Sequence, residues 1–349
     1  MNEITLSEMA RRSGLDERTL QEHAAAGRIP GARLEGGRWR VPERSFVLMP
    51  EPPGKTAEVL GKRIDAPRVP LARFGTRGRP LVLATFNFAG GVGKTSLSRD
   101  LAVLLAAAGY RVLVVDADPQ ANLTTYLNPA TPEVIGLEQT VNRAYREKVL
   151  PEPLVLDERL HLVPATIVLS LLEQELAQNQ IWLPRLHDAL RATGPRYDVV
   201  VLDSPPSAGQ LTMGNLIAAD YALVPAETSP KGVTAAETII GRFDAYAITK
   251  REWLRDDGAR LGLAAVVPTH YDARTTGAQT QLERLRAMSS RTTPPLAQRP
   301  GPYGKALEQR TPVPLLRQDR TVRAATEELH RVTAAVVKNL IEQETEGLR

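Results

Sequence analysis

Residues 81–96 read LVLATFNFAGGVGKTS, an apolar run followed by a glycine-rich loop that ends in Gly93-Lys94-Thr95. The apolar run predicts a strand buried on both faces, and the residues after the loop predict a helix over about 96–108. Glycines let successive backbone N–H groups point at phosphate oxygens, and a helix start adds the positive end of its dipole. The stretch therefore predicts a nucleotide-phosphate site, and it sets the fold class of this part of the chain.

Each residue of the loop has an expected role. Lys94 would neutralise the β- and γ-phosphates and act in catalysis, and the Thr95 hydroxyl would hold Mg²⁺. We predict that ATP and Mg²⁺ are the cofactors. The residues expected to bind the nucleotide are Gly90, Gly91, Val92, Gly93, Lys94, Thr95 and Ser96.

Two acidic segments follow other apolar runs. Asp116 and Asp118 come directly after the predicted strand 111–115, and two carboxylates two residues apart at a strand's end point the same way. The run 198–202 ends in Asp203, which is the Walker B pattern with an aspartate near Mg²⁺. Each segment alone is a modest signal, but their order and placement favour one composite site.

From residue 80 onward, short β-branched runs alternate with helical patterns, which predicts an α/β fold with a mostly parallel sheet. We expect three parts: a small module at 1–45, a proline- and glycine-rich linker at 46–79 and an ATPase domain at 80–349. The strand candidates are Leu81–Phe86, Arg111–Val115, His161–Val163, Asp198–Leu202, Tyr221–Val224 and Leu263–Val267.

Composition excludes several classes. The chain has no cysteine, which rules out disulfides, thiol nucleophiles and cysteine-bound metal clusters. It has no run of 18 apolar residues and no secretory pattern at its start, so we expect a cytoplasmic protein without a membrane partner.

The first 45 residues predict a winged helix-turn-helix. Thr5 and Glu8 form a capping box for a helix to about Arg12, and Asp16 caps a second helix over about 17–26. Segments 32–35 and 38–41 flank Gly36-Gly37 and predict a hairpin, or wing. This module resembles the MerR and excisionase type of DNA-binding domain, and dimerisation alone is the alternative. The residues predicted to contact DNA are Arg18, Thr19 and Gln21 on the second helix and Arg33, Arg38 and Arg40 on the wing.

Segments 90–95, 115–122, 201–207, 219–225 and 271–275 resemble the ParA family of DNA-partition ATPases, which belongs to the deviant Walker class. The resemblance covers about residues 80–340. It implies an ATP-dependent homodimer, binding to non-specific DNA, and hydrolysis stimulated by a centromere-binding ParB-type partner. It further implies that Asp118 positions the attacking water and that Asp116 lies near Mg²⁺.

One position departs from that family. Ala89 occupies the place of a second, signature lysine that in relatives reaches the partner subunit's nucleotide. Loss of a cation from developing phosphoryl charge slows hydrolysis, as loss of an arginine finger does in other NTPases. Lys231 and Arg274 are the candidate substitutes for the missing lysine. The alternative for Lys231 is a solvent-exposed lysine without this role. The alternative for Arg274 is a contact with DNA or with the subunit interface. We also predict Arg274 as a DNA contact.

These observations favour a partition ATPase that also represses its own operon through the N-terminal module. Ala89 motivates a rival, an ATP-switched transcription regulator with little hydrolysis, and a small-molecule ligase of the dethiobiotin-synthetase type is a third reading. The stretch 281–325 carries nine basic residues against three acidic ones, which suits a polyanion. Its basic residues are Arg284, Arg286, Arg291, Arg299, Lys305, Arg310, Arg317, Arg320 and Arg323.

Overall fold

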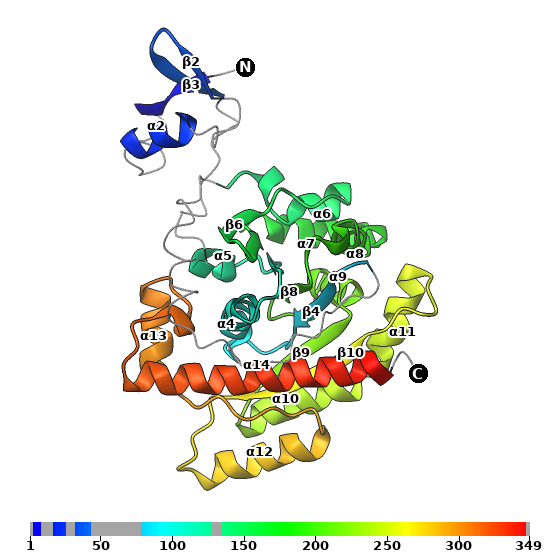
Figure 1. Cartoon of the computed structure of the whole chain (residues 1–349). Coiled ribbons are helices and arrows are strands. Elements are labelled where there is room, and N and C mark those ends of the chain that lie inside the picture. Colours follow the sequence, from blue (N-terminus) through cyan, green and yellow to red (C-terminus); the bar gives the residue numbers. More distant parts are fainter. Residues whose placement is uncertain (1–2, 8–16, 26–31, 43–77, 128–134, 347–349) are drawn as a thin grey trace.

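A computed structural model describes residues 3–7, 17–25, 32–42, 78–127 and 135–346 (Figure 1). The strands of the domain that begins near residue 80 are β4 Leu81–Thr85, β5 Val112–Asp116, β6 Leu154–Asp157, β7 Leu160–Val163, β8 Val199–Asp203, β9 Tyr221–Glu227 and β10 Gly262–Thr269. Its α-helices are α4 Lys94–Ala107, α5 Asn122–Leu127, α6 Asn142–Glu147, α7 Leu169–Gln178, α8 Arg185–Arg191, α9 Gln210–Ala218, α10 Pro230–Gly241, α11 Phe243–Leu254, α12 Thr276–Met288, α13 Pro300–Glu308 and α14 Arg320–Glu346. Short 3₁₀ turns lie at Leu137–Gln139, Gln180–Trp182, Gly194–Arg196 and Val313–Leu315.

The strands form a seven-stranded sheet in the order β10-β9-β4-β8-β5-β7-β6. All neighbours are parallel except β6, which pairs antiparallel with β7 at the edge. Chain order therefore reverses around the central β4, and the carboxyl ends of β4, β5 and β8 lie side by side. This switch point is where open α/β sheets bind ligands.

Alternate residues of each central strand pack into two separate cores. Leu81 and Leu83 face a core that α4 and α14 cover, whereas Val82 and Ala84 face one covered by α6 to α9 and α11. Each of the strands β4, β5 and β8 has five residues, and all of these residues are buried, as expected for strands covered on both faces. A rigid, doubly covered sheet thus fixes the strand ends that carry the polar residues.

All six predicted strands are present, with ends shifted by a few residues. Strand β6 was not predicted, because its apolar run of Leu154-Val155-Leu156 is short and is followed by the charged residues 157–159. The expected helix after the glycine-rich loop begins two residues early, at Lys94. The linker predicted at 46–79 lies largely outside the described residues.

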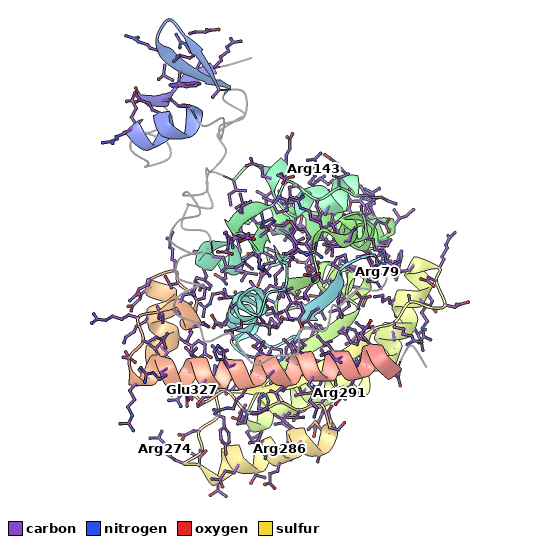
Figure 2. The ribbon with its side chains drawn as sticks, viewed as in Figure 1. Arg79, Arg143, Arg274, Arg286, Arg291 and Glu327 are labelled. Carbon is purple, nitrogen blue, oxygen red and sulfur yellow. The ribbon has the colours of Figure 1, made fainter. Side chains whose placement is uncertain are left out.

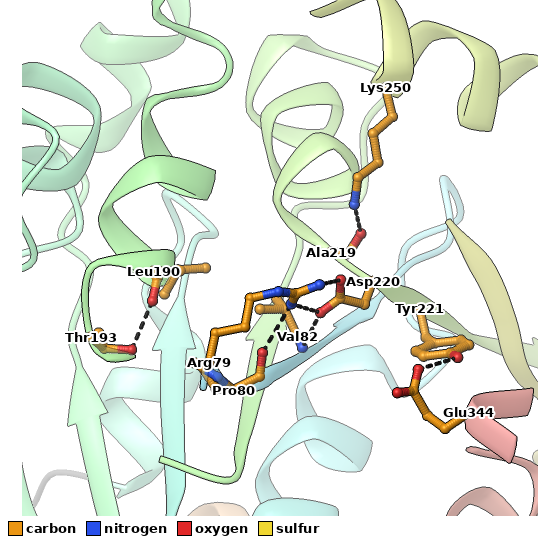
Figure 3. A network of polar contacts seen from close by, with 10 residues as sticks. All are labelled: Arg79, Pro80, Val82, Leu190, Thr193, Ala219, Asp220, Tyr221, Lys250 and Glu344. Carbon is orange, nitrogen blue, oxygen red and sulfur yellow. Dashed lines mark hydrogen bonds and ion pairs between the residues drawn. The ribbon is translucent and has the colours of Figure 1, made fainter. Parts of the chain in front are cut away.

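A polar network anchors the start of β4 at the opposite end of the sheet (Figure 3). Arg79 donates from Nη1 and Nη2 to the two carboxylate oxygens of Asp220, at 2.7 and 2.8 Å. The backbone N–H of Val82 donates to the same carboxylate at 3.0 Å. On α11, buried Lys250 donates from Nζ to the carbonyl of Ala219. The network ties β4, β9 and α11 together where the described part of this domain begins.

The N-terminal part contains α2 Glu17–Ala25 and a small sheet of β1 Glu3–Thr5, β2 Arg33–Glu35 and β3 Arg38–Pro42, in the order β1-β3-β2. The predicted hairpin is confirmed, and Gly36 and Gly37 both adopt positive φ, which its two-residue turn requires. Thr5, expected as a helix cap, ends β1, which pairs antiparallel with β3, and helix begins at Leu6. The rest of that first helix lies outside the described residues.

The last helix packs against the sheet. Val332, Val336 and Leu340 on α14 are buried in the core shared with α4, as expected for a docked helix. Across the described ranges, none of the helices has the length and apolar content needed to cross a membrane.

Candidate nucleotide site

The glycine-rich loop connects the end of β4 to α4. Gly91 and Gly93 have φ of +75° and +89°, a region that side chains with a Cβ rarely adopt. Gly93 occupies the N-cap of α4, and within the described residues no side chain caps that helix. The first N–H groups of α4 therefore stay available for an anion. Val92 points its side chain into the interior, while its carbonyl accepts from the Thr269 hydroxyl at 3.0 Å.

Lys94 is only 6% exposed, and its Nζ donates to the carbonyl of Ala89 at 2.7 Å. Burial lowers the pKa of Lys94, while the nearby carboxylates of Asp203 and Asp118 act to raise it. The lysine is thus folded back over the loop, in position to exchange a carbonyl for a phosphate oxygen.

Asp203 ends β8 beside the loop and is fully buried. Its Oδ1 accepts from the Ser98 hydroxyl at 2.8 Å, and Oδ2 finds no hydrogen-bond partner among the described residues. Burial, and secondly the charge of Asp116, raises the pKa of Asp203 to about 7, while the nearby hydroxyls of Thr95 and Ser98 act to lower it. An orphaned carboxylate oxygen next to a hydroxyl is the donor set that Mg²⁺ prefers, so these residues fit that metal.

The two aspartates after β5 have different environments. Asp118 lines the cavity described below, and burial raises its pKa. Asp116 is fully buried, does not line the cavity, and accepts hydrogen bonds from Thr124 and from the backbone of Asp118. Burial raises the pKa of Asp116 to about 6. Asp116 is the neighbour of Asp203 across the sheet, but protein donors occupy both of its oxygens, and its place near Mg²⁺ stays a prediction.

A cavity of about 470 Å³ opens beside the loop. Gly90, Gly91, Gly93, Lys94, Thr95 and Ser96 line one side of it, together with Asp118. A second wall comes from the end of β10, from the segment before α13 and from α13 itself, and its residues include Thr269, His270, Leu296, Gln298, Arg299 and Tyr303. None of these residues was predicted from the sequence as part of this site, although Thr269 and His270 lie shortly after the predicted strand 263–267.

The residues predicted to contact DNA from the N-terminal module lie on α2 and the wing. Arg18 and Gln21 are exposed on α2; Thr19 lies on the same helix, but its side chain is outside the described residues. Arg33 and Arg38 are exposed and Arg40 is half-buried. Arg33 is also paired with Glu35 at 3.0 Å. Among the described residues of this module, the apolar side chains of Leu6 and Ala24 are buried.

Arg274 is 88% exposed just before α12, and its guanidinium holds Asp272 through Nε and Nη2, both at 2.9 Å. Figure 2 shows Arg274 and Arg286 on the outside of the molecule near α12. Within the basic stretch, three side chains are in ion pairs, which reduces its net field. These pairs are Arg284 with Glu237, Arg299 with Glu328 and Lys305 with Asp319.

The glycine-rich loop between a buried strand and a helix, the lysine within it and the aspartate that ends β8 define this chain as a P-loop ATPase. Residues 81–254 match the family model described as "AAA domain", and residues 3–48 match the one described as "Helix-turn-helix domain". The chain is 35% identical over 347 residues to the "Probable plasmid-partitioning protein ParA" of Thermus thermophilus, covering 98% of this chain and 94% of that protein. The chain belongs to the ParA family of partition ATPases.

Solved structures agree on the fold. The McdA–ATP complex of Cyanothece superposes with a TM-score of 0.62 at 23% identity, covering 75% of this chain and 97% of that one. Cobyrinic acid a,c-diamide synthase of Mycobacterium smegmatis, with bound ADP and magnesium, gives a TM-score of 0.53 at 30% identity, covering 66% of this chain and 91% of that one. The predicted ParA resemblance, the α/β fold class and the ATPase activity are confirmed.

Proposed function

We propose that this protein segregates a plasmid or chromosome by an ATP cycle. ATP closes a homodimer that coats non-specific DNA, and a centromere-binding ParB-type partner triggers hydrolysis and release. The observation that carries the proposal is the loop-to-aspartate geometry: Lys94 and Asp118 line one open cavity, and the buried Asp203, with its orphaned Oδ2, lies close enough to Lys94 to act on its pKa. The near-full-length likeness to a plasmid-partitioning protein supports the same cycle.

The chain's residues divide the chemistry among them. Gly90 to Ser96 hold the phosphates through backbone N–H groups, and Lys94 exchanges the Ala89 carbonyl for phosphate oxygens. Thr95 and Asp203 would hold Mg²⁺, which would supply positive charge to neutralise the transferred phosphoryl group. Asp118, at the rim of the cavity, orients the attacking water.

Ala89 makes the chain a slow ATPase. A methyl group cannot supply a cation to the partner subunit's nucleotide, and the Ala89 carbonyl is engaged by Lys94 of the same chain. The same observation favours one second candidate, an ATP-switched transcription regulator that scarcely hydrolyses. The two functions differ in whether DNA-bound protein is released as ATP is consumed.

The N-terminal module would bind an operator and repress the protein's own operon. Its exposed Arg18 and Gln21, with Thr19, would read the major groove, and Arg33, Arg38 and Arg40 would contact phosphates. Arg274 would contact non-specific DNA from the ATPase domain. The protein would then act in the cytoplasm, on the nucleoid, as a homodimer without a membrane partner.

DNA binding by the full chain tests the proposal. Binding to random-sequence duplex and to the upstream region of its own gene is measured without nucleotide, with ADP and with ATP. We expect ATP alone to support binding to random duplex, Lys94→Ala to abolish that binding, and the exposed-lysine control Lys338→Ala to retain it. Binding restricted to the upstream fragment, with or without ATP, would instead support the regulator.

A further inference from the structure

The loop between β5 and α5 is held by the buried carboxylate of Asp116, which does not line the cavity. Asp116 Oδ1 accepts the backbone N–H of Asp118 at 3.1 Å. Asp116 Oδ2 accepts both the backbone N–H and the hydroxyl of Thr124, at 2.8 and 2.7 Å. With three donors on two oxygens, this buried carboxylate connects the start of α5 to the backbone of the residue expected to orient water.

Thr124 is fully buried and uses its hydroxyl in both directions. The hydroxyl donates to Asp116 and accepts the backbone N–H of Ala165 at 2.9 Å. Ala165 follows β7, the strand next to β5 in the sheet. Thr124 therefore fixes Asp116 against a rigid neighbouring strand end, which a residue of the same volume without a hydroxyl cannot do.

The loop itself adopts a conformation that needs such support. Ala121 has φ of +51°, in the left-handed region that is unfavourable for a residue with a Cβ. Its N–H donates to the Asp118 carbonyl at 2.9 Å, and the Gln120 N–H donates to Asp118 Oδ1 at 2.9 Å. The strained turn sets the direction of the Asp118 side chain. Asp116 holds both ends of this turn, through the backbone of Asp118 and through Thr124.

We propose that Thr124 and Asp116 are positioning residues for hydrolysis: Thr124 orients Asp116, and Asp116 holds the backbone of Asp118 so that its carboxylate meets the attacking water. This inference rests on the role given to Asp118 in the proposed function and extends it to two residues that do not touch the nucleotide. It also gives Asp116 a role other than binding Mg²⁺, because its oxygens are occupied by protein donors.

The test separates ATP binding from turnover in full-length protein. Thr124→Val is compared with Thr124→Ser and with Thr125→Val, whose hydroxyl on the same helix donates to the Ala121 carbonyl and does not contact Asp116. ATP·Mg²⁺ affinity is measured by equilibrium titration and turnover under saturating ATP with DNA. Misplacement of a catalytic group by about an ångström lowers rate on the order of 100-fold.

We expect Thr124→Val to lower kcat by roughly 10- to 100-fold with ATP affinity within about threefold, Thr124→Ser to restore most of the rate, and Thr125→Val to resemble wild type. In an Asp118→Asn background, Thr124→Val should have no further effect on kcat. Asp116→Asn should leave the Mg²⁺ dependence of ATP binding unchanged.

Three results would overturn the assignment. These are equal kcat in Thr124→Val and Thr125→Val, a loss of turnover matched by an equal loss of ATP affinity, and independent effects of the Thr124 and Asp118 substitutions. If the wild type hydrolyses ATP, any of these three results is still compatible with the proposed partition cycle. A wild type that binds ATP and never turns it over would overturn both.

Discussion

Lys250 offers a stability test of the network at the base of the sheet. Its side chain is 2% exposed, and burial lowers the pKa of Lys250 to about 8, with Asp220 acting in the opposite direction. An unfolded lysine titrates near 10.4, so between these two pH values the unfolded chain binds a proton that the folded chain has released. The free energy of unfolding contributed by this group therefore rises with pH across the window from about 8 to about 10.

The size of the effect follows from the shift. One unit of pKa corresponds to about 1.4 kcal/mol, so raising the pH from 8 to 10 should stabilise the wild type by about 2 kcal/mol relative to Lys250→Met. Urea unfolding followed by tryptophan emission measures this, because Trp182 and Trp253 pack against the core that α11 covers. Lys338→Met, at an exposed lysine, is the matched control and should show no such difference. A wild-type minus Lys250→Met difference that stays flat from pH 8 to 10 would refute the reasoning.

Three further perturbations test other contacts. Asp100→Ala should destabilise the fold by about 3–5 kcal/mol in urea unfolding, because it leaves the fully buried guanidinium of Arg99 without its carboxylate. Gly93→Val should weaken ATP binding at least tenfold by titration, since a β-branched residue cannot hold φ of +89°, and an unchanged affinity would contradict the phosphate-loop geometry. Arg274→Ala should lower the salt dependence of non-specific DNA binding by about one phosphate contact, whereas Asp272→Asn, which frees Arg274, should strengthen binding; equal effects of the two would count against a DNA contact.

The local sequence pattern was sufficient to predict structure and site residues where one chain segment contains both a strand and the functional residues that follow it. The apolar runs before Gly90, Asp116 and Asp203 predicted three strands, and because parallel strands end at one edge, they also predicted that these residues meet. The hairpin around Gly36-Gly37 is another such case, since its turn has a sequence preference of its own.

What the sequence did not reveal depends on contacts between distant segments. The wall at Leu296 to Tyr303 lies about 200 residues after the phosphate loop in the sequence, so no local pattern connects the two segments. Thr124 carries no motif, and its role appears only when Asp116 and Ala165 are brought to it. Thr5 lies directly before the helix that begins at Leu6, as its pattern predicts, but its pairing in β1 with β3 joins distant segments and has no local signal.

ATP hydrolysis by the purified full-length protein, with and without non-specific DNA, tests the account most directly. Wild type is compared with Lys94→Ala, Ala89→Lys and the exposed control Lys338→Ala. We predict slow wild-type turnover that is lost in Lys94→Ala, rises in Ala89→Lys and is unchanged in Lys338→Ala. Turnover that survives Lys94→Ala would contradict the site, and intact ATP binding with no wild-type turnover, even with the centromere-binding partner present, would contradict the partition cycle.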